Sequence, residues 1–485
     1  MVPSVRKYFF LFISFLYLYG CTPSGQESDK LSSRNKPAVT PIKFDLDKIK
    51  ARGSIIAIVD NSSTGYFIYK GQPMGYEYEL LKKYANDQKL RLETRLITSI
   101  DQAFEMLNNG EGDIIAYSLT VTKERKEIVD FTDYHFTTRQ VLVQKKPDNW
   151  RDITKDETED MLIRNQVNLI GKQINVRKGS SYIDRLKNLS QEIGGDIIIV
   201  EEPDTVETEG IIREVAKGNV KYTVSDEMVA DVNAAYYPNI DVKTPISFPQ
   251  QIAWAVRKNS PKLLASVNKW MKKIKQKPTF NVIYRKYYNS PRSSSMRAKS
   301  EFSSISGDKI SPYDDLVKKA AEKLDWDWKL IVAQMYRESR FDPKAKSWAG
   351  AYGLMQLIPE TGRRFGAKNM FNPEQNINAA VAYLDYLDNL WAKTIDDKKM
   401  RQKFVLASYN VGLGHVEDAR NLAEKYDHDP TLWEGNVAKF LRLKSTKEYF
   451  TDPIVTSGYC RGDEPVNYVR DIFDYYEQYN QLIGS

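Results

Sequence analysis

The stretch "RESRFDPKAKSWAGAYGLMQLIPETG", Arg337 to Gly362, decides the fold class of the second half of this 485-residue chain. It starts at the end of an apolar helical segment, passes through a turn at Pro343 and enters a glycine-rich start of another helix. In the preceding segment Ile331, Met335 and Glu338 follow one another at helical spacing, so their side chains share one stripe. Glu338 is therefore expected to face the same side as the core.

A glutamate in this position has two interpretations. Burial against apolar surface disfavours the ionised carboxyl group, so its pKa rises toward the range in which it donates a proton at neutral pH. A general acid at a glycosidic oxygen requires that property. The alternative is a solvated charge at a helix end, paired with Arg337 or Arg340. Spacing alone leaves both open.

The order of residues in this stretch resembles the signature of the soluble lytic transglycosylase family of lysozyme-like enzymes: Glu-Ser, a Pro-containing turn, Gly-Ala-x-Gly-Leu-Met-Gln, then Pro and Thr. "LASYNVG" from Leu406 resembles the family's Ala-Tyr-Asn element, with Ser408 in place of the usual alanine. "DEPVNYVRDI" from Asp463 resembles its Glu-Thr-x-x-Tyr-Val element, with Pro465 in place of the threonine. The resemblance spans nearly all of residues 312–485 and implies a mainly α, lysozyme-like domain.

The resemblance implies that Glu338 is a single catalytic acid and base that cleaves peptidoglycan and leaves 1,6-anhydromuramyl ends. A hydrolase would need a second carboxyl group about 5 to 9.5 Å away, across the sugar. Asp342 is the nearest candidate in sequence, but it precedes Pro343 and looks like a turn former. The residues that the resemblance implies for substrate binding are Ser339, Gly353, Leu354, Met355, Gln356, Tyr409, Asn410 and Tyr468.

The first half of the chain has a different pattern. Short apolar runs rich in β-branched residues, such as "SIIAIVD" from Ser54 and "GDIIIVE" from Gly195, alternate with amphipathic segments such as residues 76–88 and 261–275. This alternation predicts mainly parallel α/β sheets. We expect two α/β lobes over residues 54–290, with late segments returning to the first lobe so that a cleft lies between them.

The run "GDIIAYSLTVTKERKEIVDFTDYHFTTRQVLVQKK", residues 112–146, resembles the bacterial extracellular solute-binding proteins of the polar amino acid type. In that family an arginine pairs with a ligand α-carboxylate, for which the guanidinium fork is suited. The resemblance implies this role for Arg125, although a surface arginine paired with Glu124 or Glu127 is the plain alternative. The residues implied for ligand binding are Thr120, Arg125, Ser180, Ser181 and Asp226.

The N-terminus predicts export. Arg6 and Lys7 precede the apolar run of residues 8–20, which is too short for a stable membrane span and has the order of a signal peptide. Its end resembles a bacterial lipobox, which implies a lipidated Cys21 and a periplasmic protein anchored to the cell outer membrane. An uncleaved signal anchor is the alternative. Cys460, the other cysteine, is expected to be a buried small hydrophobe.

Composition predicts the domain boundaries of the chain. Polar segments rich in Ser, Pro and Lys predict a tether over 21–53 and a linker over 291–311, around a two-lobed domain (54–290) and a catalytic domain (312–485). A net charge of +7 without a basic block argues against nucleic acid as a partner. The three histidines are scattered, and neither a phosphate loop nor a nucleotide fingerprint occurs, so no metal and no cofactor are expected.

This domain order resembles the membrane-bound lytic murein transglycosylases. The expected partners are glycan strands of peptidoglycan, the membrane through Cys21, and muropeptides or amino acids in the first domain. We expect the ligand of that domain to modulate or target cleavage. Two other classes remain open: a hydrolytic muramidase, and a solute receptor whose second domain only anchors it on glycan.

Overall fold

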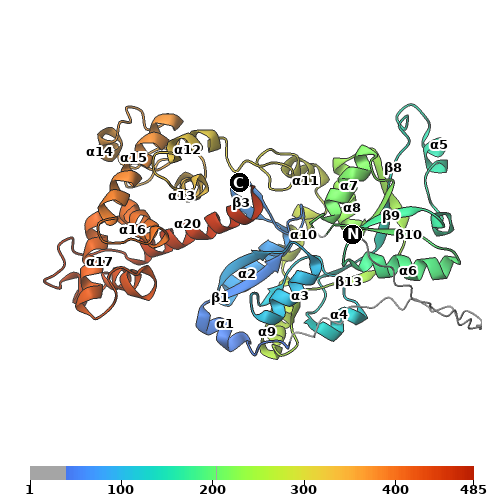
Figure 1. Cartoon of the computed structure of the whole chain (residues 1–485), viewed down its shortest axis with the longest axis horizontal. Helices are drawn as coiled ribbons and strands as arrows, with labels where there is room; N and C mark the ends of the chain where they lie inside the picture. Colours follow the sequence, from blue (N-terminus) through green and yellow to red (C-terminus); the bar gives the residue numbers. More distant parts are fainter. Residues whose placement is uncertain (1–39, 204, 485) are drawn as a thin grey trace, which may run out of the picture. The chain divides into compact units, whose positions relative to one another are not determined.

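The computed structural model describes residues 40–203 and 205–484 (Figure 1). The predicted signal peptide, residues 1–20, and Cys21 lie outside the described residues. The prediction of two α/β lobes followed by a mainly helical domain is confirmed. Within the described ranges no helix is both long and apolar enough to cross a membrane.

The first lobe is built on a five-stranded sheet with the order β4-β1-β5-β14-β6. Its first three strands are parallel, and β14 is antiparallel to β5 and to β6. The strands are β1 (Ser54–Val59), β4 (Arg91–Leu96), β5 (Ile114–Ile115), β6 (Val129–Phe131) and β14 (Ala255–Arg257), with a hairpin of β2 (Phe67–Tyr69) and β3 (Gln72–Met74). The helices are α1 (Leu46–Arg52), α2 (Tyr76–Asp87), α3 (Ile100–Asn109), α4 (Lys123–Ile128), α9 (Pro261–Ile274) and α10 (Pro278–Tyr287).

The second lobe has a sheet of order β10-β9-β11-β8-β12, in which β8 is antiparallel to β11 and to β12. Its strands are β8 (Gln140–Lys145), β9 (Gln173–Arg177), β10 (Ile198–Glu202), β11 (Tyr222–Asp226) and β12 (Ile240–Pro245). Its helices are α5 (Lys155–Asp160), the 3-10 turn Gln166–Leu169, α6 (Ser181–Ile193), α7 (Thr208–Lys217) and α8 (Glu227–Tyr236).

The chain passes between the lobes at β7 (Phe136–Thr138) and returns at β13 (Gln250–Ile252), and these two strands pair antiparallel. Strand β14 then joins the sheet of the first lobe, as the expected return of late segments requires. Ligand sites of open α/β sheets lie outside the carboxyl ends of the strands. Because the chain crosses between the lobes twice, the carboxyl ends of the strands in the two sheets face a common space.

The second domain is helical, and between residues 299 and 484 the structure has no named strand. Its helices are α12 (Asp314–Ala321), α13 (Trp328–Ser339), α14 (Pro359–Arg364), α15 (Pro373–Trp391), α16 (Lys398–Val411), α17 (Leu413–Lys425), a π-type turn (Trp433–Val437), α18 (Ala438–Leu443), α19 (Lys447–Phe450) and α20 (Asp463–Leu482). Helix α13 packs along α20, and α16 packs against α15, α17 and α20. Cys460 is buried, as predicted.

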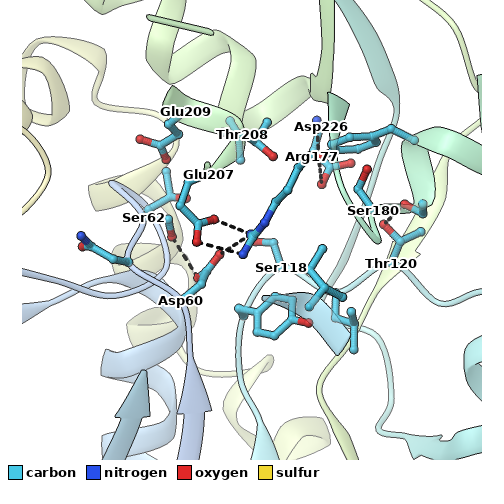
Figure 2. Close-up of a pocket in the computed structure, with 18 of the residues that line it drawn as sticks. Asp60, Ser62, Ser118, Thr120, Arg177, Ser180, Glu207, Thr208, Glu209 and Asp226 are labelled. Carbon is cyan, nitrogen blue, oxygen red and sulfur yellow. Dashed lines mark hydrogen bonds and ion pairs between the residues drawn. The ribbon is translucent and has the colours of Figure 1, made fainter. Parts of the chain in front are cut away.

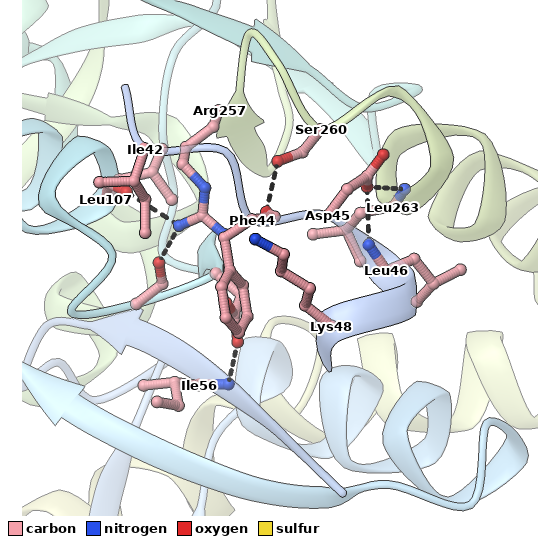
Figure 3. Close-up of polar contacts among 12 residues, drawn as sticks. Ile42, Phe44, Asp45, Leu46, Lys48, Ile56, Leu107, Arg257, Ser260 and Leu263 are labelled. Atoms are coloured by element: carbon pink, nitrogen blue, oxygen red, sulfur yellow. Dashed lines mark hydrogen bonds and ion pairs between the residues drawn. The ribbon is translucent and has the colours of Figure 1, made fainter. Parts of the chain in front are cut away.

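Residues 40–53 of the expected tether and residues 291–311 of the expected linker include helices that pack on the neighbouring domains. Within the expected tether 21–53, helix α1 packs on the first lobe. Figure 3 shows the buried guanidinium of Arg257 at this junction; it donates to the carbonyl oxygens of Phe44 (2.9 Å) and Leu107 (2.9 Å). Because the backbone of residues 41–46 satisfies buried donors, this part belongs to the folded domain.

Within the expected linker 291–311, helix α11 (Pro291–Ala298) packs against α8. The Ser304 amide donates to the Ile68 carbonyl oxygen, and the Ser304 hydroxyl accepts from the Ile68 amide, both at 3.0 Å. Ile310 is buried in the core. The serines of this segment do not make it a solvated spacer. Ser304 Oγ, for example, accepts a hydrogen bond from the Ile68 amide.

Candidate functional site

Helix α13 places Glu338 at its last turn. Asp327 caps the start by accepting a 2.9 Å hydrogen bond from the Lys329 amide, and Arg340 ends the helix in the left-handed conformation (φ 51°). Ile331 and Met335 are fully buried, whereas Glu338, next along the stripe, is partly exposed. The stripe therefore runs from the core to the edge of the domain, where Glu338 is half-buried.

The carboxyl group of Glu338 is held by helix α20. The hydroxyl of buried Tyr468 donates to Glu338 Oε1 at 2.5 Å and accepts from Nε2 of Gln334 at 3.1 Å. Burial raises the pKa of Glu338 to about 7, against the opposing effects of the Tyr468 hydrogen bond and of Arg337. Such a group is protonated in a large fraction near neutral pH and can both donate and accept a proton.

The loop Gly353–Gln356 is held in place by hydrogen bonds to Asn376, a residue that the sequence analysis missed. Buried Asn376 accepts from the Met355 amide (2.8 Å) and donates to the carbonyl oxygens of Tyr352 (3.1 Å) and Met370 (3.0 Å). Gly353 has φ +78°, and a Cβ there would lie 2.2 Å from the Met370 oxygen. A glycine is required because this loop approaches another backbone so closely.

Of the other residues predicted for substrate binding, two are buried in the core and two donate hydrogen bonds to nearby backbone carbonyl oxygens. Leu354 and Met355 are fully buried, so their side chains pack in the core and offer no surface to a sugar. The hydroxyl of Tyr409 donates to the Met355 carbonyl oxygen at 2.7 Å. The half-buried Gln356 donates to Ala345 (3.2 Å) and Gly353 (2.8 Å).

Ser339 and Asn410 have simpler environments. The Ser339 hydroxyl bonds to the Met335 carbonyl oxygen (3.2 Å), one helical turn back, and not to Glu338. Asn410 is exposed near the end of α16. Asp342 is exposed and accepts from the Lys344 amide at 2.9 Å, so it forms a local turn as predicted.

A second site lies between the two lobes. All five residues predicted for ligand binding in the first domain, Thr120, Arg125, Ser180, Ser181 and Asp226, line one cavity of about 70 Å³. Figure 2 shows Thr120, Ser180 and Asp226 on one side of it. Asp226 ends β11, and burial raises its pKa to about 7. The double crossing of the chain thus gathers residues that are more than 100 positions apart.

The lobes are closed around this cavity. The Arg125 guanidinium donates to the Thr120 carbonyl oxygen (2.9 Å) and, across the cleft, to that of Gly179 (3.3 Å). The Ser181 hydroxyl bonds to the Thr120 hydroxyl at 3.2 Å. From the other side, Glu209 accepts from the amide and the hydroxyl of Ser63, both at 3.0 Å.

Four charged residues of the cavity were missed by the sequence analysis: Asp60, Arg177, Glu207 and Glu209. In Figure 2 the Arg177 side chain reaches toward Glu207 and Asp60. It forms a two-point ion pair with Glu207 and lies 3.7 Å from Asp60. Asp60 directly follows β1 and Arg177 ends β9, so their positions at carboxyl ends of strands were a signal available in the sequence.

The hairpin β2–β3 of the first lobe contacts the end of helix α13. A Cβ on Gly71 would lie 2.6 Å from the ring of Phe341, which follows Glu338 by three residues. The Tyr479 hydroxyl of α20 donates to the Gly71 carbonyl oxygen at 2.8 Å. One continuous cluster of buried apolar side chains includes residues of the first lobe and of the helical domain.

Two family models match the two domains of this chain. The model of bacterial extracellular solute-binding proteins, family 3, matches residues 55–290, and that of the transglycosylase SLT domain matches residues 315–431. Tyr468 lies beyond the second match. Among solved structures, the amino acid ABC transporter substrate-binding protein AbpA from Streptococcus pneumoniae is 20% identical, covering 51% of this chain and 99% of its own, with a TM-score of 0.43.

Curated relatives match most of the chain and have one name, membrane-bound lytic murein transglycosylase F. The protein from Desulfosudis oleivorans is 36% identical over 430 residues, covering 89% of this chain and 90% of the relative. That from Saccharophagus degradans is 31% identical, covering 90% and 83%. With both domains matched in this order and Glu338 at the predicted helix end, the chain belongs to the membrane-bound lytic murein transglycosylase F family.

Proposed function

We propose that this lytic transglycosylase cleaves the β-1,4 bond between N-acetylmuramic acid and N-acetylglucosamine with Glu338 as its single acid and base. Protonated Glu338 donates its proton to the bridging oxygen as the bond to the anomeric carbon breaks. The muramyl 6-hydroxyl then attacks that carbon and returns its proton to the carboxylate. The product is a 1,6-anhydromuramyl end, and no water is consumed.

The observation that carries this proposal is the environment of Glu338. A pKa near 7 suits a group that must be an acid in one step and a base in the next. The Tyr468 hydrogen bond supports the carboxylate form and fixes its orientation. Asp342, the nearest carboxylate in sequence, is engaged in a turn, which favours the transglycosylase over the two-carboxylate hydrolase.

The test is digestion of purified peptidoglycan by the wild-type chain and by Glu338→Gln, with the products read by mass spectrometry. Glu424→Gln is the matched control, because Glu424 is an exposed glutamate near the end of another helix, α17. Anhydromuramyl ends from wild type and control, but not from Glu338→Gln, support the proposal. Reducing ends would make the chain a muramidase, and no cleavage by the wild type would favour the receptor interpretation.

Gln356 and Asn410 are predicted substrate contacts that are at least partly accessible and carry amide groups. Both present amide groups outside the core, as recognition of sugar hydroxyl and acetamido groups requires. Replacing Asn410 by alanine is expected to raise KM for glycan strands several-fold without changing the melting temperature. An unchanged KM would remove Asn410 from the substrate site.

The first domain is proposed to modulate cleavage by binding an amino acid or a wall-derived peptide. Contact of Gly71 with Phe341 supports this, because movement of the first lobe would reach the chain directly after Glu338. A ligand shifts such an equilibrium only by its differential affinity for the two arrangements. Cleavage rates should therefore change as stem peptides, shown by calorimetry to bind, are titrated; a constant rate at saturation would contradict the coupling.

Membrane association through a lipid on Cys21, at the periplasmic face of the outer membrane, is proposed from the lipobox-like N-terminus. Cys21→Ser is expected to lose incorporation of labelled fatty acid and to appear in the soluble periplasmic fraction. Equal labelling of wild type and Cys21→Ser would exclude acylation at this residue.

A further inference from the structure

The interlobe cavity has two chemically different ends. The head end consists of Arg125 and Asp226, which match an α-carboxylate and an α-ammonium group. The side-chain end consists of Asp60, Arg177, Glu207 and Glu209. The inference below concerns the side-chain end and depends on the proposed role of the head end as the site for an amino acid.

Charge is unbalanced at the side-chain end. Three carboxyl groups face one guanidinium, that of Arg177, and its fork is already taken by Glu207. Arg213 acts on Glu209 from a neighbouring pocket, so carboxyl groups remain in excess even when it is included. An amino-acid backbone is a zwitterion and brings no net charge to offset this. A cationic group on the ligand's side chain would balance these carboxyl groups in their ionised form.

Burial makes this imbalance costly. Burial raises the pKa of Glu207 to about 8 and that of Glu209 to about 7, and also raises that of Asp60. Carboxyl groups that are reluctant to ionise in the empty closed site ionise when a cation arrives among them. A cationic side chain therefore gains a partner that a neutral or acidic side chain does not have.

Several polar atoms around the cavity have no hydrogen-bond partner within the described part of the chain. They belong to side chains that are at least nine-tenths buried: Tyr117 OH, Arg177 Nε, Ser180 Oγ and Asp226 Oδ1. Buried polar groups without partners are uncommon in folded proteins and point to a missing ligand or water. They occur at both ends of the cavity, so a ligand that satisfies them must extend from one end to the other.

The size of the closed cavity limits what fits. About 70 Å³ corresponds to roughly five water molecules at about 10–15 Å³ each. This is comparable to one amino acid and too small for a stem peptide with its sugar unless the lobes open. The closed arrangement, held by Arg125 and Glu209 across the cleft, therefore fits a single amino acid.

We propose that the interlobe cavity binds one free amino acid whose side chain ends in a cation, either an ammonium or a guanidinium group. The ligand backbone lies between Arg125 and Asp226. Its side chain passes Tyr117 and ends among Asp60, Glu207 and Glu209. The side-chain end selects for positive charge, and the head end selects for the amino-acid backbone.

Isothermal titration calorimetry of the full chain tests this with lysine, ornithine and arginine against norleucine, glutamine and glutamate. Norleucine is the informative comparison, because it has the carbon chain of lysine without the ammonium group. We expect at least one of the three cationic amino acids to bind 30-fold or more tightly than norleucine, and glutamate not to bind. Equal affinity for lysine, arginine and norleucine, or preference for glutamate or for a diamino dicarboxylic acid, would overturn the proposal.

Two variants test whether the selectivity for cationic amino acids arises at the side-chain end of the cavity. Asp60→Asn is expected to weaken binding of the preferred cationic amino acid by tenfold or more while changing the affinity for norleucine less than threefold. Asp184→Asn, an exposed aspartate in the first turn of α6, makes the same charge change outside the cavity and should have no effect. An equal loss for both ligands in Asp60→Asn would contradict selection at this end.

The outcomes also separate this inference from the role proposed for the head end. Binding of neutral amino acids with no preference for cations would refute the inference and leave an amino-acid module in place. Binding of no amino acid by the wild type, or unchanged binding by Asp226→Asn, would refute the module's proposed ligand class itself.

Discussion

Tyr468 and Glu338 are 130 positions apart in the chain, yet the tyrosine hydroxyl donates a 2.5 Å hydrogen bond to the glutamate carboxyl group. The pair links the two long helices α13 and α20, which pack along each other. Gln334, one turn before Glu338, donates to the same hydroxyl and directs the tyrosine proton toward the carboxylate. This arrangement fixes the orientation of the proposed catalytic acid and opposes the rise in its pKa that burial causes.

Tyr468→Phe is expected to shift the pH dependence of cleavage. The tyrosine hydrogen bond favours the carboxylate, so its removal raises the pKa of Glu338 above about 7. The alkaline limb of the kcat/KM profile, where the acid is lost, should move to higher pH, and kcat should fall because orientation is lost. Tyr459→Phe, on an exposed tyrosine, is the control; an alkaline limb that stays in place would contradict the role of Tyr468.

Glu338→Gln is expected to stabilise the fold at alkaline pH. The pKa of Glu338 is higher folded (about 7) than unfolded (about 4.5), so the wild type loses stability as pH rises between these values. Glutamine removes this loss, with a gain on the order of 3 kcal/mol at most above pH 8 and none below pH 4. Urea unfolding of both proteins at several pH values measures the difference. A gain that is independent of pH would show that titration of Glu338 is not its cause.

Asp418→Asn is expected to destabilise the helical domain. Lys444 and Asp418 form an ion pair at 2.5 Å and are almost fully buried, so the substitution leaves the Lys444 charge unpaired. The expected loss is about 3–5 kcal/mol in the free energy of unfolding, partly recovered by adding Lys444→Met. Asp452→Asn is the control, because it breaks an ion pair whose lysine, Lys425, is half exposed. It should lower the free energy of unfolding by about 1 kcal/mol or less. Similar losses in both variants would contradict this account.

Gly353→Ala is expected to disrupt the Gly353–Gln356 loop. Both Gly353 (φ +78°) and Gly350 (φ +81°) are left-handed, but only at Gly353 would a Cβ meet other atoms, 2.2 Å from the Met370 oxygen. Gly350→Ala should therefore cost only the backbone strain of about 1–2 kcal/mol. Gly353→Ala should cost about 1–3 kcal/mol more and reduce cleavage sharply. Thermal unfolding and peptidoglycan digestion of both variants test this, and equal effects would exclude the steric cause.

Much of the fold follows from local patterns. The apolar run "SIIAIVD" and the stripe through Ile331 and Met335 depend on neighbouring residues only, and both elements form as predicted. The two connecting segments did not follow from composition. Their serines and backbone bond to groups from elsewhere in the chain, such as Ile68 and Arg257, which no local pattern records.

The sequence by itself determined the identity of the chain: an ordered motif around Glu338, a second family signature around Arg125, and their succession. Only the tertiary structure decided which of the motif residues are accessible at the surface and which are buried. Leu354 and Met355 are buried, Asn376 and Gln334 position the site without belonging to the predicted set, and Asp60 and Glu207 meet between two lobes. The physical reason is that side-chain exposure, pKa and charge balance depend on groups distant in the chain, which packing brings together.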